Sequence, residues 1–363
     1  MKILITTEMV LQPEKNGGGE RAVSTLAEQF RKEGHEVLVA APHFSDISLQ
    51  RDDLKPYRVI RCKRLLVPGD QVSIPSPQIK DEICKFAPDA VLMNNVGGLS
   101  MYAVEYAQER GIPAIHTIHV YYQGDIPNSI PIFTPKRRFW IENVKKFFGE
   151  EMNMADRVVC VSEHQAKIYK EQFGVTSPMK VIRNGTIFPM PNDLDALKQV
   201  ADKTFGLGEA ETVFLHVGRL ESGKRVDFSL RGLAEVKRAL SVHGKRTDFQ
   251  FVIVGTGAEK ENLALQAAEL GLQENTRFLG GLSDDELKSV YARSDLLLAP
   301  SLGETDSIAV AEAACHKVPS LVCKNTGAEG KIQDGVSGFH FENNINSHAG
   351  KILEIMHNKP LLE

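Results

Sequence analysis

The chain has 363 residues, of which 42% are hydrophobic and 25% are charged, and its formal net charge is -4 at pH 7. This composition is typical of a globular protein and excludes a disordered or collagenous chain, and the length predicts two domains. The mild acidity argues against a dedicated nucleic-acid binder. Five cysteines without a CxxC pair argue against a zinc site and favour a reducing, cytoplasmic compartment.

In chain order, short apolar runs alternate with segments of helical periodicity. We expect a strand at 3–6, a glycine loop at 17–19, a helix at 20–33 and a strand at 36–41. This order predicts a parallel sheet covered by helices. The alternation continues with strands at 90–93, 114–118, 158–161 and 180–182, and with helices near 100–110 and 163–173.

The pattern restarts after an irregular stretch at 184–193, which contains Gly185, Pro189 and Pro191. We therefore expect two doubly wound, Rossmann-like α/β domains, 1–186 and 187–363. Such sheets bind ligands beyond the carboxyl ends of their strands. The second half is predicted to contain helices near 194–205, 227–240 and 347–357, and strands at 212–217, 250–254, 277–279, 296–299 and 320–322.

Two glycine-rich loops have the composition of phosphate-binding turns. Gly18 and Gly19 precede the first helix, where backbone N–H groups can approach an anion, although a tight turn explains them equally well. Gly255 lies in a loop that resembles a dinucleotide fingerprint, but Lys260 occupies the place of its third glycine. A nicotinamide cofactor is therefore not expected.

A third loop, 217–225, contains Gly218 and matches G-x-x-x-x-G-K. Arg225 stands where a phosphate-binding P-loop requires Ser or Thr for magnesium, so we reject an NTPase. Arg219 and Lys224 remain as a metal-free clamp for a diphosphate, because arginine supplies a bidentate fork and lysine a point charge. The alternative is that both are solvated loop charges.

Three further residues are candidates for a binding or catalytic site. Glu304 and Glu312 lie eight positions apart, around the start of a helix, where carboxylates can accept hydrogen bonds from sugar hydroxyls or simply cap the helix. His119 follows a strand and is placed for proton transfer, although a buried structural histidine is an equal alternative. Asp193-Leu194-Asp195 matches a D-x-D metal motif, but helix capping explains it better.

The segment 136–149, KRRFWIENVKKFFG, combines five basic residues with aromatic residues at helical spacing. A basic amphipathic helix of this kind can lie on an anionic membrane. A core-packed helix with solvated charges is the alternative.

Taken together, these segments resemble glycosyltransferase family 4, the retaining, metal-independent, sugar-nucleotide-dependent enzymes. The resemblance implies the GT-B fold, in which two Rossmann-like lobes face each other, the first for the acceptor and the second for the donor. The matching segments are NGGGERAVSTLAEQFRKEGHEV, GIPAIHTIH, ADRVVCVSE and VIRNG in the first half, and VGRLESGKRVD, FVIVGTG, RFLGGLSDDEL and SLGETDSIAVAEAACHKVPSLV in the second.

The resemblance also implies roles for individual positions. Gly18 and Gly19 would approach the diphosphate and sugar, and His119 would lie beside the reacting sugar. Arg219 and Lys224 would neutralise the leaving diphosphate. The other donor contacts would come from Glu304 on the sugar hydroxyls, Glu312 on the ribose, Leu279 near the base, and Gly218, Gly255, Ser307 and Ile308.

The implied activity is transfer of a hexosyl group from a UDP- or GDP-sugar to a hydroxyl of a glycan, lipid or small molecule, in cell-envelope or glycan biosynthesis. No cofactor beyond the donor and no metal are expected. The loop at 121–123 is expected to contact the acceptor. The expected location is the cytoplasm, or the inner face of the membrane if 136–149 binds lipid. The alternatives are a nucleotide-sugar epimerase on the same fold, or a nucleotide-sugar-binding protein without turnover.

The sequence departs from the family pattern at three places. Thr305-Asp306-Ser307 stands where the family often has Gly-Phe-Gly, which leaves the donor sugar open. Asn184-Gly185-Thr186-Ile187 lacks the aspartate that usually follows. No helix that returns to the first lobe is expected after 347–357.

Overall fold

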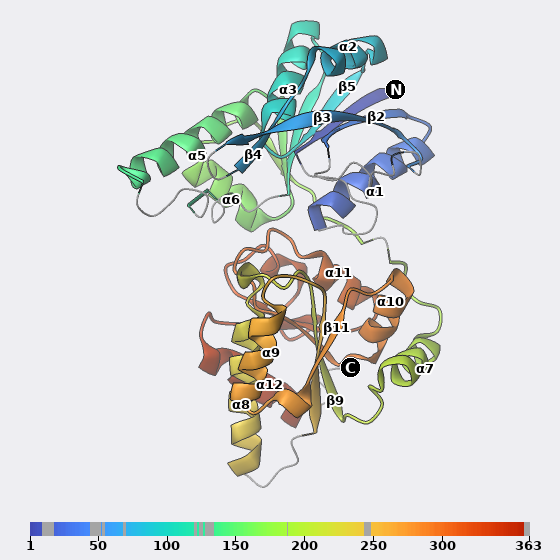
Figure 1. Ribbon diagram of the computed structural model, residues 1–363, viewed down its shortest axis with the longest axis vertical. Helices are drawn as coiled ribbons and strands as arrows, with labels where there is room; N and C mark the ends of the chain where they lie inside the picture. Colours follow the sequence, from blue (N-terminus) through green and yellow to red (C-terminus); the bar gives the residue numbers. More distant parts are fainter. Residues whose placement is uncertain are drawn as a thin grey trace. The chain divides into compact units, whose positions relative to one another are not determined.

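The computed structural model describes residues 1–8, 18–43, 52, 55–67, 70–119, 122, 126–127, 134–186, 188–242 and 248–358. The chain divides into two compact units, Met1–Asn184 (unit 1) and Gly185–Glu363 (unit 2). Each unit contains one sheet with helices on both faces (Figure 1).

Across the described part of unit 1, eight strands form a sheet in the order β4-β3-β2-β1-β5-β6-β7-β8. Neighbouring strands are parallel except β3 and β4, which are antiparallel, so the sheet is mostly rather than wholly parallel. The strands are β1 (Lys2–Thr7), β2 (Glu36–Pro42), β3 (Arg58–Val67), β4 (Asp70–Ile74), β5 (Ala90–Asn94), β6 (Ala114–Ile118), β7 (Arg157–Cys160) and β8 (Met179–Val181).

The central strands of unit 1 are apolar on both faces, as expected for a sheet covered on both sides. Along β1, Leu4 belongs to a core cluster with α2 and α3, whereas Ile3 and Ile5 belong to the cluster under α1. Figure 1 shows α2 and α3 on one side of this sheet and α1 on the other. The helices are α1 (Gly18–Lys32), α2 (Pro77–Phe86), α3 (Gly98–Arg110), α5 (Arg137–Asn153) and α6 (Glu163–Gln172).

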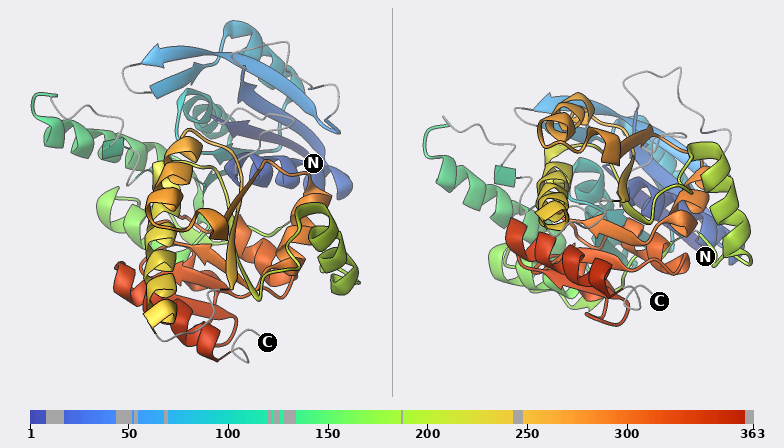
Figure 2. Two further views of the ribbon diagram at one scale, coloured as in Figure 1. Left: turned by 60° about the horizontal axis from the view of Figure 1, so that its bottom comes forward. Right: turned by 90° about the horizontal axis from the view of Figure 1, so that it is seen from below.

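Unit 2 contains a parallel sheet of six described strands in the order β11-β10-β9-β12-β13-β14. One core cluster lies under α8, α9 and α12 and the other under α7, α10 and α11, an arrangement that Figures 1 and 2 show. The strands are β9 (Thr212–Val217), β10 (Phe249–Val254), β11 (Thr276–Gly280), β12 (Leu296–Ala299), β13 (Ser320–Cys323) and β14 (Gly338–Phe341). The α-helices are α7 (Leu194–Phe205), α8 (Val226–Val242), α9 (Lys260–Glu269), α10 (Asp284–Arg293), α11 (Ile308–Cys315) and α12 (Ile345–His357), and the short 3₁₀ helices are η3 (Ser222–Lys224), η4 (Gln273–Asn275) and η5 (Glu329–Lys331).

The fold settles the expectation for the D-x-D sequence. Asp193 caps α7, because its Oδ1 accepts a hydrogen bond from the backbone N of Ala196 at 2.9 Å, so the D-x-D sequence is a helix cap as predicted. No helix in the described part of the chain is long and apolar enough to cross a membrane. The residues after 358, where a returning helix would begin, lie outside the described part.

Candidate functional site

The carboxyl edge of the sheet of unit 2 brings its glycine loops into direct backbone contact. Gly218 N donates to Val254 O at 3.0 Å, and Gly255 N donates to Gly280 O at 2.7 Å. A Cβ atom on Gly255, whose φ is +137°, would lie 1.8 Å from the carbonyl oxygen of Gly218. Glycine at 255 is therefore required for the close approach of two loops, whether or not a ligand binds there.

Lys224 and Glu304 form the central ion pair of this edge. Lys224 Nζ donates to Glu304 Oε1 at 2.6 Å, although the two residues come from η3 and from the loop before α11. Burial, the largest single influence, opposes ionisation of Glu304, but the charge and the hydrogen bond of Lys224, together with smaller contributions from His216 and Lys331, hold the pKa of this carboxyl below its ordinary value. Glu304 is therefore a carboxylate at neutral pH and acts only as a hydrogen-bond acceptor.

His216 lies beside this pair and was not predicted from the sequence. It is buried at the end of β9, with Nδ1 3.3 Å from Leu298 O, and its Nε2 has no hydrogen-bond partner among the described residues. Burial, with the charge of Lys224, lowers its pKa to about 4. The ring is therefore neutral at pH 7 and adds no cation to the site.

Arg219 does not join Lys224 in the structure. Its side chain is 65% exposed and lies 3.0 Å from Glu221 Oε1 in the same loop. An exposed ion pair of this kind contributes at most about 1 kcal/mol, so an anionic ligand can displace Glu221 at little cost. Arg219 and Lys224 therefore lie in the same loop but have different partners. Lys224 pairs with Glu304, whereas Arg219 pairs with Glu221.

Glu312 lies in α11 and is 3% exposed. Its Oε2 accepts a hydrogen bond from the Tyr291 hydroxyl at 2.8 Å. The Tyr291 ring stacks on His316, whose Nδ1 lies 2.8 Å from the backbone oxygen of Glu312. Tyr291 therefore orients the Glu312 carboxylate, a role that no sequence pattern indicated because the two residues lie on different helices.

The remaining predicted donor residues of unit 2 lie on the same edge. Ser307 and Ile308 begin α11, and Ser307 has φ +53°, in the left-handed region that favours glycine. Leu279 is half-buried at the end of β11.

In unit 1, His119 follows β6 and is held by two asparagines. Its backbone N donates to Asn95 Oδ1 at 3.3 Å, and its Nε2 lies 3.2 Å from Asn94 Oδ1. Asn94 Nδ2 donates to Thr6 O, so its Oδ1 faces the ring and the proton of the neutral ring lies on Nε2. Burial lowers the pKa of His119 to about 4, which makes the neutral ring the form present at pH 7.

The glycines before the first helix lie differently from the prediction. Gly18 and Gly19 form the first turn of α1 rather than a loop before it, and residue 17 lies outside the described part.

Tyr122 packs in the core of unit 1. It is 9% exposed, its hydroxyl accepts a hydrogen bond from Val96 N at 2.8 Å, and its ring packs edge-on against Phe148. The expectation that Tyr122 contacts the acceptor is therefore wrong, because its ring and its hydroxyl are both used in the core. Residues 121 and 123 lie outside the described part.

Two carboxyl groups at the start of α3, of the buried Glu151 and the partly buried Glu8, were not predicted from the sequence. Glu151 Oε1 accepts from Gly97 N at 3.2 Å, and Glu8 Oε1 accepts from Leu99 N at 3.0 Å. Burial is the main cause that raises the pKa of Glu151 to about 8, and the charge of Glu8 adds to it. Neither residue is part of a sequence motif, since they are far apart along the chain.

Because of Glu151, we expect the folded protein to lose stability as the pH rises. Its pKa is higher in the folded than in the unfolded protein, so its contribution is complete below about pH 4.5 and is lost as the pH rises through about 8, at about 1.4 kcal/mol per pKa unit. We expect Glu151→Gln to gain thermal stability over the wild type progressively between pH 5 and pH 8. Glu150→Gln, at an exposed neighbour, is the control, and a difference independent of pH would contradict the assignment.

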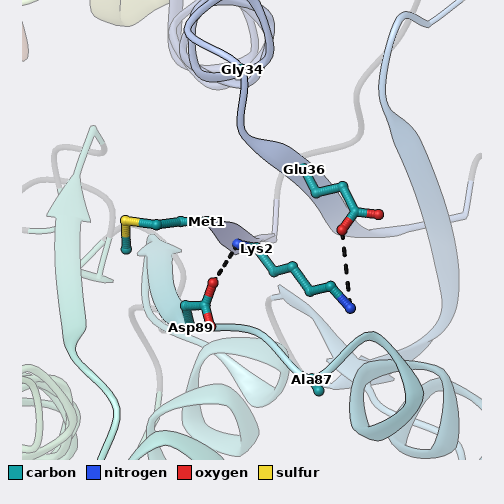
Figure 3. Close-up of a pocket in the computed structure, with 6 residues that line it drawn as sticks. All are labelled: Met1, Lys2, Gly34, Glu36, Ala87 and Asp89. Atoms are coloured by element: carbon teal, nitrogen blue, oxygen red, sulfur yellow. Dashed lines mark hydrogen bonds and ion pairs between the residues drawn. The ribbon is translucent and has the colours of Figure 1, made fainter.

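A pocket lies at the edge of the sheet of unit 1 where the parallel strands begin (Figure 3). Its volume is about 400 Å³, and Lys2 N donates to Asp89 Oδ2 across it at 2.7 Å. Because doubly wound sheets bind ligands at the carboxyl ends of their strands, this amino-end pocket is not the candidate site. Its lining residues are Met1, Lys2, Gly34, Glu36, Ala87 and Asp89.

In the described part of the chain, no three or more His, Cys, Asp or Glu side chains come together in a group that could hold a metal ion.

Family profiles match both units. The profile described as Glycosyltransferase Family 4 matches residues 16–186, and the profile described as Glycosyl transferases group 1 matches residues 198–363. The chain is 26% identical over 357 residues to the GDP-mannose-dependent alpha-mannosyltransferase of Corynebacterium glutamicum, covering 93% of this chain and 76% of that protein. It is 24% identical over 352 residues to the alpha-monoglucosyldiacylglycerol synthase of Streptococcus pneumoniae, covering 93% and 75%.

Solved structures show the same fold at lower identity. The Anabaena protein HepE, in complex with UDP and glucose, has a TM-score of 0.72 and 19% identity, over 100% of this chain and 91% of that one. Sucrose-phosphate synthase from Thermosynechococcus elongatus has a TM-score of 0.75 and 18% identity, over 99% and 91%. These structures have the GT-B fold, which is therefore the fold of this chain.

Proposed function

Because the chain belongs to the glycosyltransferases, with a family 4 domain followed by a group 1 domain, we propose that it transfers a hexosyl group from a UDP- or GDP-sugar to an acceptor hydroxyl with retention of configuration. The Lys224–Glu304 pair carries this proposal. It places one cation and one ionised carboxylate 2.6 Å apart at the edge of the sheet where ligands bind.

In the proposed reaction, Lys224 stabilises the negative charge that develops on the leaving diphosphate. Such preorganised electrostatic stabilisation is usually the largest single contribution to catalysis. Arg219 adds a second cation when it leaves Glu221. The backbone N–H groups at Gly18 and Gly19, in the first turn of α1, are proposed to approach the same diphosphate. No metal is required in this scheme, because the two side chains supply the positive charge.

Glu304 is proposed to accept hydrogen bonds from hydroxyls of the donor sugar, and Glu312, oriented by Tyr291, from the ribose. The donor contacts are completed by Leu279 near the base and by Gly218, Gly255, Ser307 and Ile308. In unit 1, His119 is proposed as the catalytic histidine beside the reacting sugar. The leaving phosphate takes the proton of the acceptor hydroxyl.

The relatives support a nucleotide sugar as the donor but differ in its base. The name of the Corynebacterium protein specifies GDP-mannose, and the Anabaena structure holds UDP and glucose. Both nucleotides therefore belong in the substrate panel. The acceptor hydroxyl is on a glycan, a lipid or a small molecule.

The experiment is incubation of the purified chain with UDP- and GDP-hexoses, with and without a chelator. We expect slow release of UDP or GDP that the chelator leaves unchanged, and an α-configured sugar product by NMR. Conversion of the donor to its epimer without nucleotide release would indicate an epimerase instead. Thermal stabilisation by a sugar nucleotide without any turnover would indicate a binding protein.

We also propose that α5 brings the protein to anionic lipid surfaces. Phe139, Trp140 and Phe147 are 58%, 51% and 50% exposed, and five basic residues lie within 136–149. Figure 1 and both views of Figure 2 show the N-terminal end of α5 extending away from the sheet of unit 1. Exposed aromatic side chains beside basic ones are the composition of an interfacial helix.

This membrane contact has a direct optical test, because Trp140 is the single tryptophan of the chain. We expect vesicles containing phosphatidylglycerol to shift its fluorescence to shorter wavelength, and high salt or purely zwitterionic vesicles to abolish the shift. Lys136→Gln/Arg138→Gln is expected to weaken retention on the anionic vesicles, whereas Lys351→Gln on α12 is the control. An unchanged spectrum at low salt would refute the contact.

A further inference from the structure

A buried ion pair includes Asp306, two residues after Glu304 in the same turn. Asp306 is 1% exposed, the Lys331 side chain is 6% exposed, and Lys331 Nζ lies 3.0 Å from Asp306 Oδ2. Asp306 belongs to the turn that leads from β12 into α11, and Lys331 ends η5, in the segment after the neighbouring strand β13. The pair therefore joins two adjacent loops at the carboxyl edge of the sheet.

The backbone of the same turn is held by the same segment. Gly327 N donates to Glu304 O at 2.8 Å, and a Cβ atom on Gly327 would lie 1.8 Å from the carbonyl oxygen of Thr305. Ser307 has φ +53° and ψ +97°, a conformation that a non-glycine residue adopts only where its surroundings enforce it. The shape of 304–307 is thus determined by its contact with 327–331.

Stability alone does not account for a buried charge pair at this place. Taking both charges out of water opposes folding, and packed apolar side chains commonly do as well or better. An apolar alternative exists in the family pattern, where a phenylalanine often stands at the position of Asp306. The ion pair therefore points to a role in positioning the two loops, because its one specific contact fixes them relative to each other.

Lys331 also acts electrostatically on Glu304. After burial, which opposes ionisation, Lys224 is the largest influence on the pKa of Glu304, and Lys331 lowers that pKa further. When Lys224 turns to a diphosphate, Lys331 remains as a fixed cation near the Glu304 carboxylate. Glu304 therefore stays an acceptor for sugar hydroxyls while its first partner is engaged elsewhere.

From this geometry we propose that Asp306 and Lys331 are positioning residues that determine which hexose the enzyme accepts. The inference rests on the proposed function, because it concerns the sugar of the same donor. The pair fixes the 304–307 turn and the place of the Glu304 carboxylate, so that hydroxyls of one configuration are bound and those of an epimer are left unpaired. Discrimination by unpaired polar groups is large because the buried acceptor loses its partner.

The test compares the wild type with Asp306→Asn/Lys331→Met, which removes both charges and nearly preserves side-chain size. The readouts are the melting temperature, the inhibition constant of the free nucleoside diphosphate, and the ratio of kcat/KM for the preferred donor over its C2 and C4 epimers. We expect the ratio to fall by about 10-fold or more. Inhibition by the nucleoside diphosphate, which lacks the sugar, is expected to be unchanged.

Two further variants separate positioning from general stability. Asp202→Asn/Arg293→Met removes a partly buried ion pair between α7 and α10 of the same unit, with N–O distance 2.8 Å, and is expected to leave the ratio unchanged. Lys331→Arg keeps the charge and is expected to retain the ratio. If Asp306→Asn/Lys331→Met does not fold, Asp306→Glu, which displaces the carboxylate by one methylene, is expected to lower the ratio in its place.

The outcomes are distinct. A folded Asp306→Asn/Lys331→Met variant with the discrimination of the wild type overturns the inference and leaves the proposed function intact, and the same holds for an unchanged ratio in Asp306→Glu. A wild type that releases nucleotide from no UDP- or GDP-hexose overturns the proposed function and the inference together.

Discussion

Lys224→Ala is expected to lower kcat for cleavage of the nucleotide sugar by about 100- to 1,000-fold, the usual effect of removing one preorganised stabilising group. The reason is that Lys224 is the only cation of the 217–225 loop held in the site by a second charged group, Glu304 at 2.6 Å, whereas Arg219 is paired with Glu221 in its own loop. The loss should therefore appear mainly in kcat, with a smaller change in KM.

Steady-state release of UDP or GDP measures this effect. One variant serves as a control and a second tests the partner of Lys224. Lys351→Ala removes a lysine of α12 that pairs only on the surface with Glu354, and it is expected to retain the activity of the wild type. Glu304→Gln is expected to lose activity while keeping its fold, since the amide is isosteric. Full activity in Lys224→Ala would remove the diphosphate role from this residue.

Acid is expected to unfold the protein well above the pH at which carboxylates alone would do so. Burial lowers the pKa of four histidines. The value falls to about 4 for His116, His119 and His216, and to about 3 for His348. Their folded pKa values lie below the ordinary value near 6.5, so the stability that they contribute is complete above about pH 6.5 and is lost as the pH falls toward 4. Each pKa unit corresponds to about 1.4 kcal/mol.

His348 allows this prediction to be tested at one residue. Its ring packs edge-on between Phe228 and Phe341, with centroids 5.4 and 4.8 Å away, and neither ring nitrogen has a hydrogen-bond partner in the described part of the chain. Between pH 7 and pH 4.5, the melting temperature of His348→Leu is expected to fall less than that of the wild type. His357→Leu, on the exposed end of α12, serves as the control, and equal slopes in both variants would contradict the assignment.

Much of the fold could be predicted because its strands are apolar on both faces. Such strands appear as short uninterrupted hydrophobic runs, and β1, β9, β10 and β12 were predicted in this way. The antiparallel pair β3–β4 was not predicted. β3 carries Arg58, Arg61 and Lys63 among its apolar residues, and no local sequence pattern indicates its pairing with β4. Helix α2 was missed although Ser76 caps it and Pro77 begins it.

The candidate site divides in the same way. The order and spacing of the motifs made Lys224, Glu304 and Glu312 candidate residues, because these features resemble the family pattern. The partners of these residues come from other loops and helices, so His216, Tyr291 and Lys331 could be found only in the folded chain. Tyr122 was assigned wrongly for the same reason, since nothing local reveals that its hydroxyl accepts a hydrogen bond from Val96.

The most direct test of the account is the release of nucleotide from UDP- and GDP-hexoses by the wild type and by Lys224→Ala, each with and without a chelator. We predict that the wild type releases UDP or GDP at a rate that the chelator does not change, and that Lys224→Ala loses this activity while remaining folded. Activity that depends on a metal ion, or that survives in Lys224→Ala, would contradict the proposal that Lys224 and Glu304 form a metal-free donor site.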